Sequence, residues 1–583
     1  MKSSIFSRWL SWIIIVIWVF TLSACESIPD ERSLYTYTLK GDNTAKGYDE
    51  AVAVACIQGI LNRRVPQLYV LSDLHDRTVY WLDTLSTGDN WLAGRERRAV
   101  ADLSELVSIA GGRLKGAIIW DPEVPASLNV ATTLAGLEDG IVLSPDQADL
   151  YLDRWRLPII KDFRGMFTGK ESGSRKNDAY RWAIREFLET GRCDPHWLCL
   201  YEDAFMTRLK GDISYAVTRD WSVRNKSFVY DLSPWGDEAP LDDPDQPLGT
   251  DLETYHQMLT AVYRLTKGKR LTEVAGFFSF PKYSNITGYE SKHDPVPTEW
   301  ETVHLISPYN CYQNTVAHLC FNQSLHAQAP VNELQQGRPE LKRQAEAGKT
   351  YLCILMADYD SATPLYDFLP DHWSDSARGE IPLAWGINPN LIETYPDIIQ
   401  YFYRTKSSND FFTADASAAG YMNPNRIDTS QLSLFVEHNQ YFYDRLDMSL
   451  SPMVLDWDEP TPAVKDAFAR FSPDGFSTIV IDFHHAGGKL PEPHVWKGMP
   501  VMELINSACN FSTAQQSAKE LSAAIPGTNP NGRPSFFFFR IVWTRPGQVV
   551  EAINELKKLR PELDIEVLDP YNFFHLFKSI EPN

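Results

Sequence analysis

The chain has 583 residues, which is too many for a single hydrophobic core, and we expect two or three domains. Its formal net charge is −21, and no dense run of Lys and Arg interrupts that acidic balance. Because a nucleic-acid partner needs a basic face, the composition excludes nucleic-acid binding proteins. The 17 Trp and 12% aromatic residues suit either sugar-binding surfaces or large cores, and composition leaves both interpretations open.

The N-terminus has the pattern of a bacterial lipoprotein signal peptide. Lys2 and Arg8 precede a short apolar core, Ile13–Phe20, and the sequence LSA then places small residues before Cys25. We therefore expect cleavage before Cys25, lipidation of that cysteine and tethering to a membrane. Glu26, rather than Asp, follows the cysteine, which favours the outer membrane or cell surface. A plain secretory signal with an incidental cysteine is the alternative.

The remaining cysteines form no recognisable framework. The chain has 8 cysteines, so lipidation of Cys25 leaves an odd number at irregular spacing. Cys193 and Cys199 could form a disulfide in an oxidising compartment, and Cys311 with Cys320 is a weaker candidate. No CxxC pair occurs, so a cysteine zinc site is not expected. The GxSxG, P-loop and GxGxxG motifs are also absent, which removes the commonest hydrolase and nucleotide-binding signatures.

Helices and strands alternate in the first half of the chain, which predicts one or two small α/β domains. The predicted helices are Ala51–Leu61, Asn129–Leu137 and Asp178–Thr190. The predicted strands are Gln67–Leu71, Ala117–Trp120, Gly140–Leu143 and Ser227–Leu232. The segment Glu238–Thr250 then interleaves acids and prolines without a hydrophobic period, and it predicts a linker or a long surface loop.

Beyond this segment the alternation becomes regular. The predicted strands are Ala275–Phe280, Thr302–Ser307, Tyr351–Ala357, Ile381–Ile387, Asp410–Ala416, Met453–Trp457, Thr478–Phe483 and Phe536–Val542. The predicted helices are Pro339–Ala347, Asn390–Tyr403, Ser430–Arg445, Pro462–Phe471, Met502–Cys509 and Thr513–Ala524. Eight strands with helices between most of them predict a (β/α)8 TIM-barrel-like domain, and a doubly wound open sheet is the alternative. A final helix and strand, Gly547–Leu559 and Asp564–Leu568, would cover the outside.

The predicted organisation therefore has four parts. They are a signal peptide (1–24), an N-terminal α/β region (25–237), an acidic Pro-rich linker (238–250) and a C-terminal barrel-like domain (251–583).

Function in a barrel lies at the carboxyl ends of its strands, and acidic side chains gather there. Asp358 and Asp360 follow the third predicted strand at a spacing that directs both to one side, where each raises the pKa of the other. Such a pair suits hydrolysis of a glycosidic bond, which needs one protonated and one ionised carboxyl. It would equally suit a divalent metal held through oxygens, and loop capping is a third interpretation. Glu299 and Asp482 are further catalytic candidates.

The stretch Asp410–Pro424, DFFTADASAAGYMNP, is typical of a buried parallel strand that runs out into a tight loop, where Gly420 tolerates a positive φ. Tyr421 in this loop and His484 after the seventh strand would line a sugar subsite. The other candidate substrate-binding residues are Trp385, Asn388 and Lys282. His484 and His485 with Asp482 could instead complete a metal site.

The segment Ala418–Pro424, AAGYMNP, resembles the motif of the GxGYxYP family of putative glycoside hydrolases, which are secreted or lipid-anchored bacterial proteins. Other segments that resemble the family are Gln58-Gly59, Asn62-Arg63, Thr132–Gly136, Asp231–Ser233, Lys282-Tyr283, Glu299-Trp300 and the pair Asp358 and Asp360. The chain departs from the family pattern at Ala418 (Gly), Asn423 (aromatic), Tyr359 (Gly) and Ser361 (Asn). The resemblance implies an N-terminal α/β region, a barrel-like C-terminal domain and action on a glycan.

The sequence thus predicts a lipid-anchored cell-envelope glycoside hydrolase whose partners are a carbohydrate substrate and the membrane. Asp358 and Asp360 would be the catalytic carboxylates. No cofactor is implied, although a divalent metal is compatible with the acidic residues. A metal-dependent hydrolase, such as a carbohydrate deacetylase, and a non-catalytic glycan-binding lipoprotein are the two alternatives.

Overall fold

The computed structural model describes residues 33–283, 291–315, 319–456, 459–480, 492–505, 513–527 and 531–581. The predicted signal peptide and Cys25 lie outside these residues, as do Asp482, His484 and His485. Within the described ranges, no helix is both long enough and apolar enough to cross a membrane.

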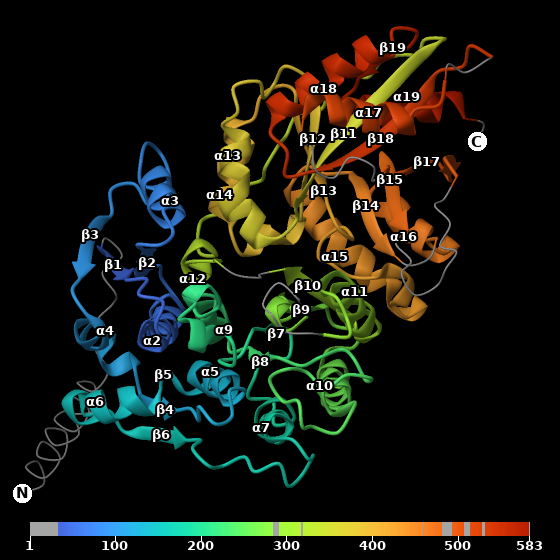
Figure 1. Ribbon diagram of the computed structural model, residues 1–583. Helices are drawn as coiled ribbons and strands as arrows, with labels where there is room; N and C mark the ends of the chain where they lie inside the picture. The colour runs from blue at the N-terminus through green and yellow to red at the C-terminus, as the bar shows by residue number, and fades with distance from the viewer. Residues whose placement is uncertain are drawn as a thin grey trace, which may run out of the picture.

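Two small parallel sheets open the chain, which confirms the prediction of small N-terminal α/β domains (Figure 1). The first has the order β2-β1-β3, with β1 Ser33–Leu39, β2 Leu68–Ser72, β3 Glu96–Val100 and helices α2 Ala45–Leu61, α3 Arg77–Leu85 and α4 Leu103–Ala110. The second has the order β5-β4-β6, with β4 Gly116–Ile119, β5 Gly140–Leu143, β6 Ile159–Asp162 and helices α5 Ser127–Glu138 and α6 Pro145–Trp155. Helix α2 contacts both sheets, and small apolar residues allow it to be buried on nearly all sides.

A third parallel sheet has the order β10-β9-β7-β8. Its strands are β7 Trp197–Leu200, β8 Phe228–Tyr230, β9 Thr272–Gly276 and β10 Cys311–Thr315, and helices α7 Arg175–Ala183, α9 Arg219–Asn225, α10 Thr250–Thr266 and α11 Pro295–Ile306 accompany them. Strands from both sides of segment Glu238–Thr250 therefore pair in one sheet, and Asp242 within that segment is buried.

The predicted strand Thr302–Ser307 is wrong, because these residues end helix α11. Asp294 precedes Pro295, and proline at the first position of a helix favours helix formation from that point. The β-branched residues Thr302 and Val303 lie buried on this helix, so tertiary packing overrides their preference for a strand.

Two further sheets make up the C-terminal part (Figure 1). One has the order β13-β12-β11-β18, with β11 Lys349–Tyr359, β12 Leu383–Ile387, β13 Asp410–Ala414 and β18 Ser535–Val542, and β19 Asp564–Val567 pairs with the start of β11. The other has the order β14-β15-β17-β16, with β14 Leu450–Asp456, β15 Gly475–Val480, β16 His494–Trp496 and β17 Met499–Glu503. All pairs are parallel except β16–β17.

Six longer helices accompany these two sheets. They are α14 Pro396–Thr405, α15 Leu432–Arg445, α16 Pro462–Phe471, α17 Ala514–Ala524, α18 Pro546–Leu559 and α19 Pro570–Ile580. The α/β class and the strands β11 to β15 and β18 match the prediction. The strand expected at Ala275–Phe280 instead belongs to the third sheet as β9, and Met502 lies in strand β17 rather than at the start of a helix.

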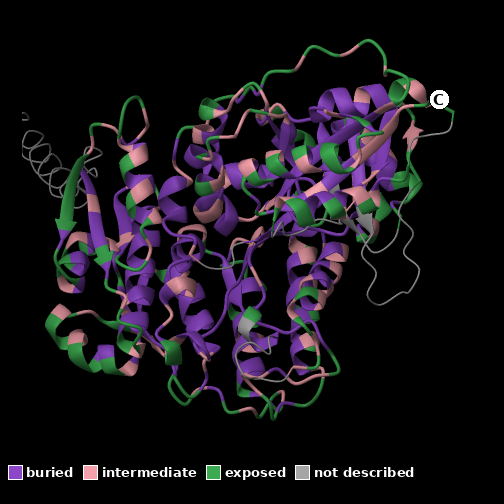
Figure 2. Ribbon diagram, turned by 45° about the horizontal axis from the view of Figure 1, so that its top comes forward, coloured by how far each residue is buried: buried purple, intermediate pink, exposed green. Residues whose placement is uncertain are grey.

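The buried residues lie mainly along the strands and the inner helix faces, whereas the exposed ones follow the connecting loops (Figure 2). Cys193, Cys199, Cys311 and Cys320 are all buried, and neither of the two candidate pairs is joined by a disulfide. Cys199 packs in β7 against Tyr201 and Trp221, and burial raises the pKa of its thiol to about 12.

Candidate functional site

Three chain segments converge where β11 ends. Asp358 is the penultimate residue of this strand, and its backbone N–H donates to Asp415 Oδ2 at 2.9 Å. Arg540 on β18 donates from its guanidinium to the Asp358 carboxylate, and the indole N–H of Trp543 donates to the Asp358 carbonyl oxygen at 2.9 Å. Because β11 pairs with β18 and β12, and β12 pairs with β13, the parallel ends of these strands bring the segments together.

Asp415 is the site residue that sequence reasoning missed. It directly follows β13, is fully buried, and accepts hydrogen bonds from the backbone N–H groups of Asp358 and Ala416. Gly386 on β12 leaves room for it, since a Cβ there would lie 2.4 Å from Asp415 Oδ2. Its position near the end of the predicted strand Asp410–Ala416 was the available signal.

The backbone around the carboxylates is strained. Asp358, Ala416 and Ala418 have φ values of 66°, 53° and 93°, in a region that residues with a side chain rarely adopt. Gly420 follows with a φ of 102°, as the sequence predicted for a residue free to take a positive φ. Strain of this kind persists only where surrounding contacts hold it, and it is concentrated at functional sites.

Several hydrogen bonds hold the loop after β13 in place. Asn388 Oδ1 accepts from the N–H of Gly420 at 2.8 Å, and Asn439 Oδ1 accepts from the N–H of Ala419 at 2.8 Å. Tyr421 exchanges two backbone hydrogen bonds of 2.8 Å with Gln313 of β10, which joins the loop to the third sheet. Asn388 is therefore at the site, where it positions the loop.

Glu299 reaches the same site from helix α11, one of the helices that accompany the third sheet. The Tyr421 side chain is buried beside it. Burial raises the pKa of Glu299 to about 7, the interaction with Tyr421 opposes that rise, and the charge of Asp358 adds to it. Glu299 is thus a carboxyl that can exchange a proton near neutral pH.

Asp360 and Asp415 complete a group of four carboxyls with Asp358 and Glu299. Burial raises the pKa of Asp360 well above its usual value, and the charges of Asp415 and Asp358 raise it further. Burial and the charge of Asp358 raise the pKa of Asp415 to about 7. Arg540 opposes these shifts. Glu299, Asp360 and Asp415 thus have raised pKa values, which suits general acid–base chemistry.

Two of the predicted site residues lie elsewhere. Trp385 is fully buried in the core, where it packs against Tyr359 and Trp373 and donates from its indole N–H to Asp410 at 2.9 Å. Lys282 is buried at the carboxyl ends of the third sheet, because the strand that precedes it is β9. Asp482 and His484 lie outside the described residues.

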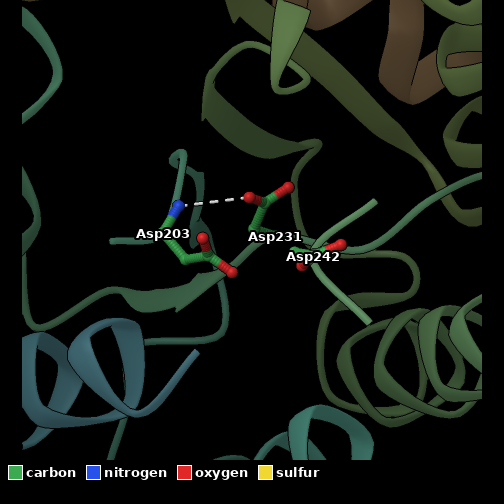
Figure 3. A group of neighbouring side chains, drawn as sticks. All are labelled: Asp203, Asp231 and Asp242. Carbon is green, nitrogen blue, oxygen red and sulfur yellow. Dashed lines mark hydrogen bonds between the residues drawn. The ribbon is translucent and has the colours of Figure 1, made fainter. Parts of the chain in front are cut away.

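Lys282 lies among a second group of acids. Among the residues that the structure describes, Asp203, Asp231 and Asp242 are close enough together to hold a metal ion (Figure 3). The Lys282 ammonium already lies among them, 2.5 Å from Asp231, 2.9 Å from Asp242 and 3.6 Å from Asp203. A lysine thus supplies the positive charge that a cation would bring.

Three models of protein-family domains match the chain. They are the GxGYxYP putative glycoside hydrolase C-terminal domain at residues 348–578, the GxGYxYP_N first domain at 35–110 and the GxGYxYP_N second domain at 114–190. No curated protein matches the chain.

Among solved structures, the chain is similar to a putative hydrolase from Bacteroides thetaiotaomicron, with 16% identity, a TM-score of 0.70 and coverage of 95% of this chain and 96% of that one. At this identity the similarity shows a shared fold. A putative polysaccharide deacetylase from Mycobacterium smegmatis matches with 13% identity and a TM-score of 0.26 over 42% of this chain and 96% of that one.

Proposed function

This chain belongs to the GxGYxYP family of putative glycoside hydrolases, and we propose that it hydrolyses a glycosidic bond at the carboxyl ends of β11 and β13. The observation that carries the proposal is the convergence of Asp358, Asp360, Asp415 and Glu299 on one place, with Arg540 opposing their charge. Hydrolysis of a glycosidic bond needs one carboxyl that donates a proton and one that carries negative charge.

The environments of the carboxyls support a division of roles. Asp360 keeps its proton because it is buried among other acids, so it suits the general acid that protonates the leaving oxygen. Asp358 is held by the Arg540 guanidinium and suits the carboxylate that acts on the sugar or on water. Asp415 positions Asp358 by accepting from the Asp358 backbone N–H, and Glu299 interacts with Tyr421.

The proposal is tested with the Asp360→Asn variant and a panel of glycans, with release of reducing ends as the readout. Loss of a general acid should lower turnover by about 10²–10⁴-fold. Asp89→Asn, which alters an exposed carboxylate after helix α3, is the matched control and should keep full activity. Full turnover by both Asp360→Asn and Asp358→Asn would rule out this site.

We further propose that the two C-terminal sheets close into a barrel. Support comes from a parallel bridge between Ile505, which follows β17, and Phe539 of β18, and from the contact of β13 with β14. Both are places where one sheet would continue into the other.

The lipid anchor and the location at the outer membrane or cell surface are also proposals, carried by the sequence around Cys25. Fractionation of cells that express the full chain tests them. Cys25→Ala should move the protein from the membrane fraction to the soluble fraction, and retention of the variant at the membrane would contradict the anchor.

A further inference from the structure

A cavity of about 280 Å³ lies between the third sheet and the C-terminal part. Strands β9 and β10 contribute Glu273 and Tyr312 to its lining. Helix α15 contributes His438, and the turn that precedes α14 contributes Glu393. None of these residues takes part in the proposed catalytic site.

The cavity and the catalytic site lie on opposite sides of the loop after β13. Successive residues of an extended segment point to opposite faces, so Tyr312 points away from the face to which Gln313 and its partner Tyr421 point. The Tyr312 ring packs against Gly420, where a Cβ would lie 2.2 Å from it. His438 Nε2 donates to the carbonyl oxygen of Ala419 at 2.7 Å. The cavity wall is therefore the back of the loop that carries Tyr421.

Two carboxyl groups form the polar end of the cavity. Tyr312 donates from its hydroxyl to Glu273 Oε2 at 3.2 Å, and Asn314 donates from its amide to Glu273 Oε1 at 3.2 Å. Burial raises the pKa of Glu273 to about 8, and the charge of Glu393 adds to the rise. The Glu393 carboxyl has no hydrogen bond or ion pair with any residue in the described part of the chain. Its oxygens are thus available to a ligand.

Charges of both signs line the cavity, Lys269 and Arg270 on one side of the balance and Glu393 and Glu437 on the other, so it offers no excess charge to an ionic ligand. Arg270 stacks on the ring of Trp197 at the cavity wall, 5.2 Å from the ring centroid, so a cation would meet like charge. An anion would meet Glu393 and Glu437. A neutral ligand with several hydroxyl groups would instead donate to the carboxyl oxygens and place its C–H face on Tyr312 and Phe442.

We propose that this cavity is a second carbohydrate site, which binds one neutral sugar unit without cleaving it. The proposal rests on the proposed function in that the substrate is a carbohydrate. A sugar bound here would contact the back of the loop that carries Tyr421, and it would hold a glycan next to the catalytic site.

The test measures sugar binding to the full chain in the Asp360→Asn background, so that no probe is consumed. Glucose, galactose, N-acetylglucosamine and their β-linked disaccharides are the probes, with isothermal titration calorimetry and saturation-transfer NMR as readouts. Leu434→Trp fills the cavity from α15, and Ser433→Trp, an exposed neighbour outside the lining, is the matched control. Glu393→Gln removes the charged acceptor and keeps the shape.

We expect at least one probe to bind, with affinity reduced about tenfold by Glu393→Gln, abolished at this site by Leu434→Trp and unchanged by Ser433→Trp. Absence of binding by every probe at millimolar concentration, or equal affinities in Leu434→Trp and Ser433→Trp, would overturn the proposal. Turnover by the wild-type chain is measured separately. If no sugar binds in the cavity but the wild-type chain turns over a glycan, the cavity proposal is wrong and the proposed function stands. If a sugar binds in a way that depends on Leu434 but no glycan is turned over, the cavity proposal stands and the proposed function is wrong.

Discussion

Two groups of acids, each at the carboxyl ends of parallel strands, differ in how their charge is balanced. In the third sheet, Lys176 and Lys282 lie among the acids, and both contact Asp242, at 2.7 and 2.9 Å. Lys176 also bonds Asp251, and Lys282 bonds Asp231. In the C-terminal group, Arg540 is the one cation that the described residues bring to the four carboxyls.

The balance determines what each group can do. Although burial opposes it, Lys176 and Lys282 lower the pKa of Asp242, so this carboxylate stays ionised and bound. Burial and neighbouring acids raise the pKa of Asp360, so this carboxyl holds a proton that it can donate. Acids that are matched by lysines therefore fix structure, whereas acids in excess over their cation supply chemistry, and this excess costs stability.

The largest effect is expected for Lys282→Met. This substitution leaves Asp231 and Asp242 buried without one of their partners, and it should lower the free energy of unfolding by about 3–5 kcal/mol. Urea denaturation followed by circular dichroism measures the loss. Lys46→Met, at an exposed position in α2, is the control and should change little. Equal stability of the two variants would show that the lysine is not needed to balance the acids.

The next largest effect is expected for Gly386→Ala, which perturbs the C-terminal group. The new Cβ would lie 2.4 Å from Asp415 Oδ2, so Asp415 has to move and Asp358 loses its positioning contact. We expect a loss of about 1–3 kcal/mol in the free energy of unfolding together with reduced turnover. Gly112→Ala, where nothing lies within 4 Å, is the control. Wild-type activity in Gly386→Ala would mean that Asp415 does not set the geometry.

The pH dependence of stability tests the raised pKa values in the C-terminal group. The pKa values of Asp415 and Glu299 are raised to about 7, so the folded state keeps protons that the unfolded state releases near pH 4. Their stabilising contribution is present below about pH 4 and is lost as the pH rises through about 7, by up to about 1.4 kcal/mol per pH unit for each group.

Asp415→Asn should reduce the slope of the free energy of unfolding against pH, which unfolding curves measured between pH 4 and 8 would reveal. Asp242→Asn should leave the slope in this window unchanged, since the pKa of Asp242 is lowered. A slope that persists unaltered in Asp415→Asn would contradict the raised pKa of this carboxyl.

The smallest expected effect is an increase in the free energy of unfolding. Asp360→Asn removes an acid from a group with excess negative charge, and it should raise the free energy of unfolding by about 1 kcal/mol at pH 8 while turnover is lost. The matched comparison is Asp242→Asn, which weakens contacts to two lysines and should destabilise the fold. A comparable destabilisation by both substitutions would remove the distinction between the groups.

Much of the fold follows from local patterns in the sequence. Apolar runs such as those of β11 and β18 predicted buried parallel strands, because a strand covered on both faces needs continuous apolar residues. The assignment of strands to sheets did not follow. β9 joins β7 across a long acidic segment, and this pairing moved Lys282 away from the site where it was expected.

The candidate site was predictable where residues lie directly at strand ends. Asp358, Asp360 and Asn388 are of this kind. Asp415 escaped notice because small residues surround it and Tyr421 is more conspicuous, while the depth of Trp385 depends on contacts with Tyr359 and Trp373 that no local pattern encodes. Glu299 was a candidate for the wrong reason, since the strand expected after it is the end of the helix that carries it.

That helix has a consequence for how the protein can be divided. The C-terminal family domain begins at residue 348, whereas Glu299 and the Gln313 that pairs with Tyr421 precede it in the chain. A recombinant fragment that starts at residue 348 would keep Asp358, Asp360 and Asp415. It would lack Glu299 and the backbone hydrogen bonds from Gln313 that hold the loop at Tyr421. If the proposed function holds, the catalytic unit is therefore larger than the C-terminal family domain and includes the segment that holds Glu299.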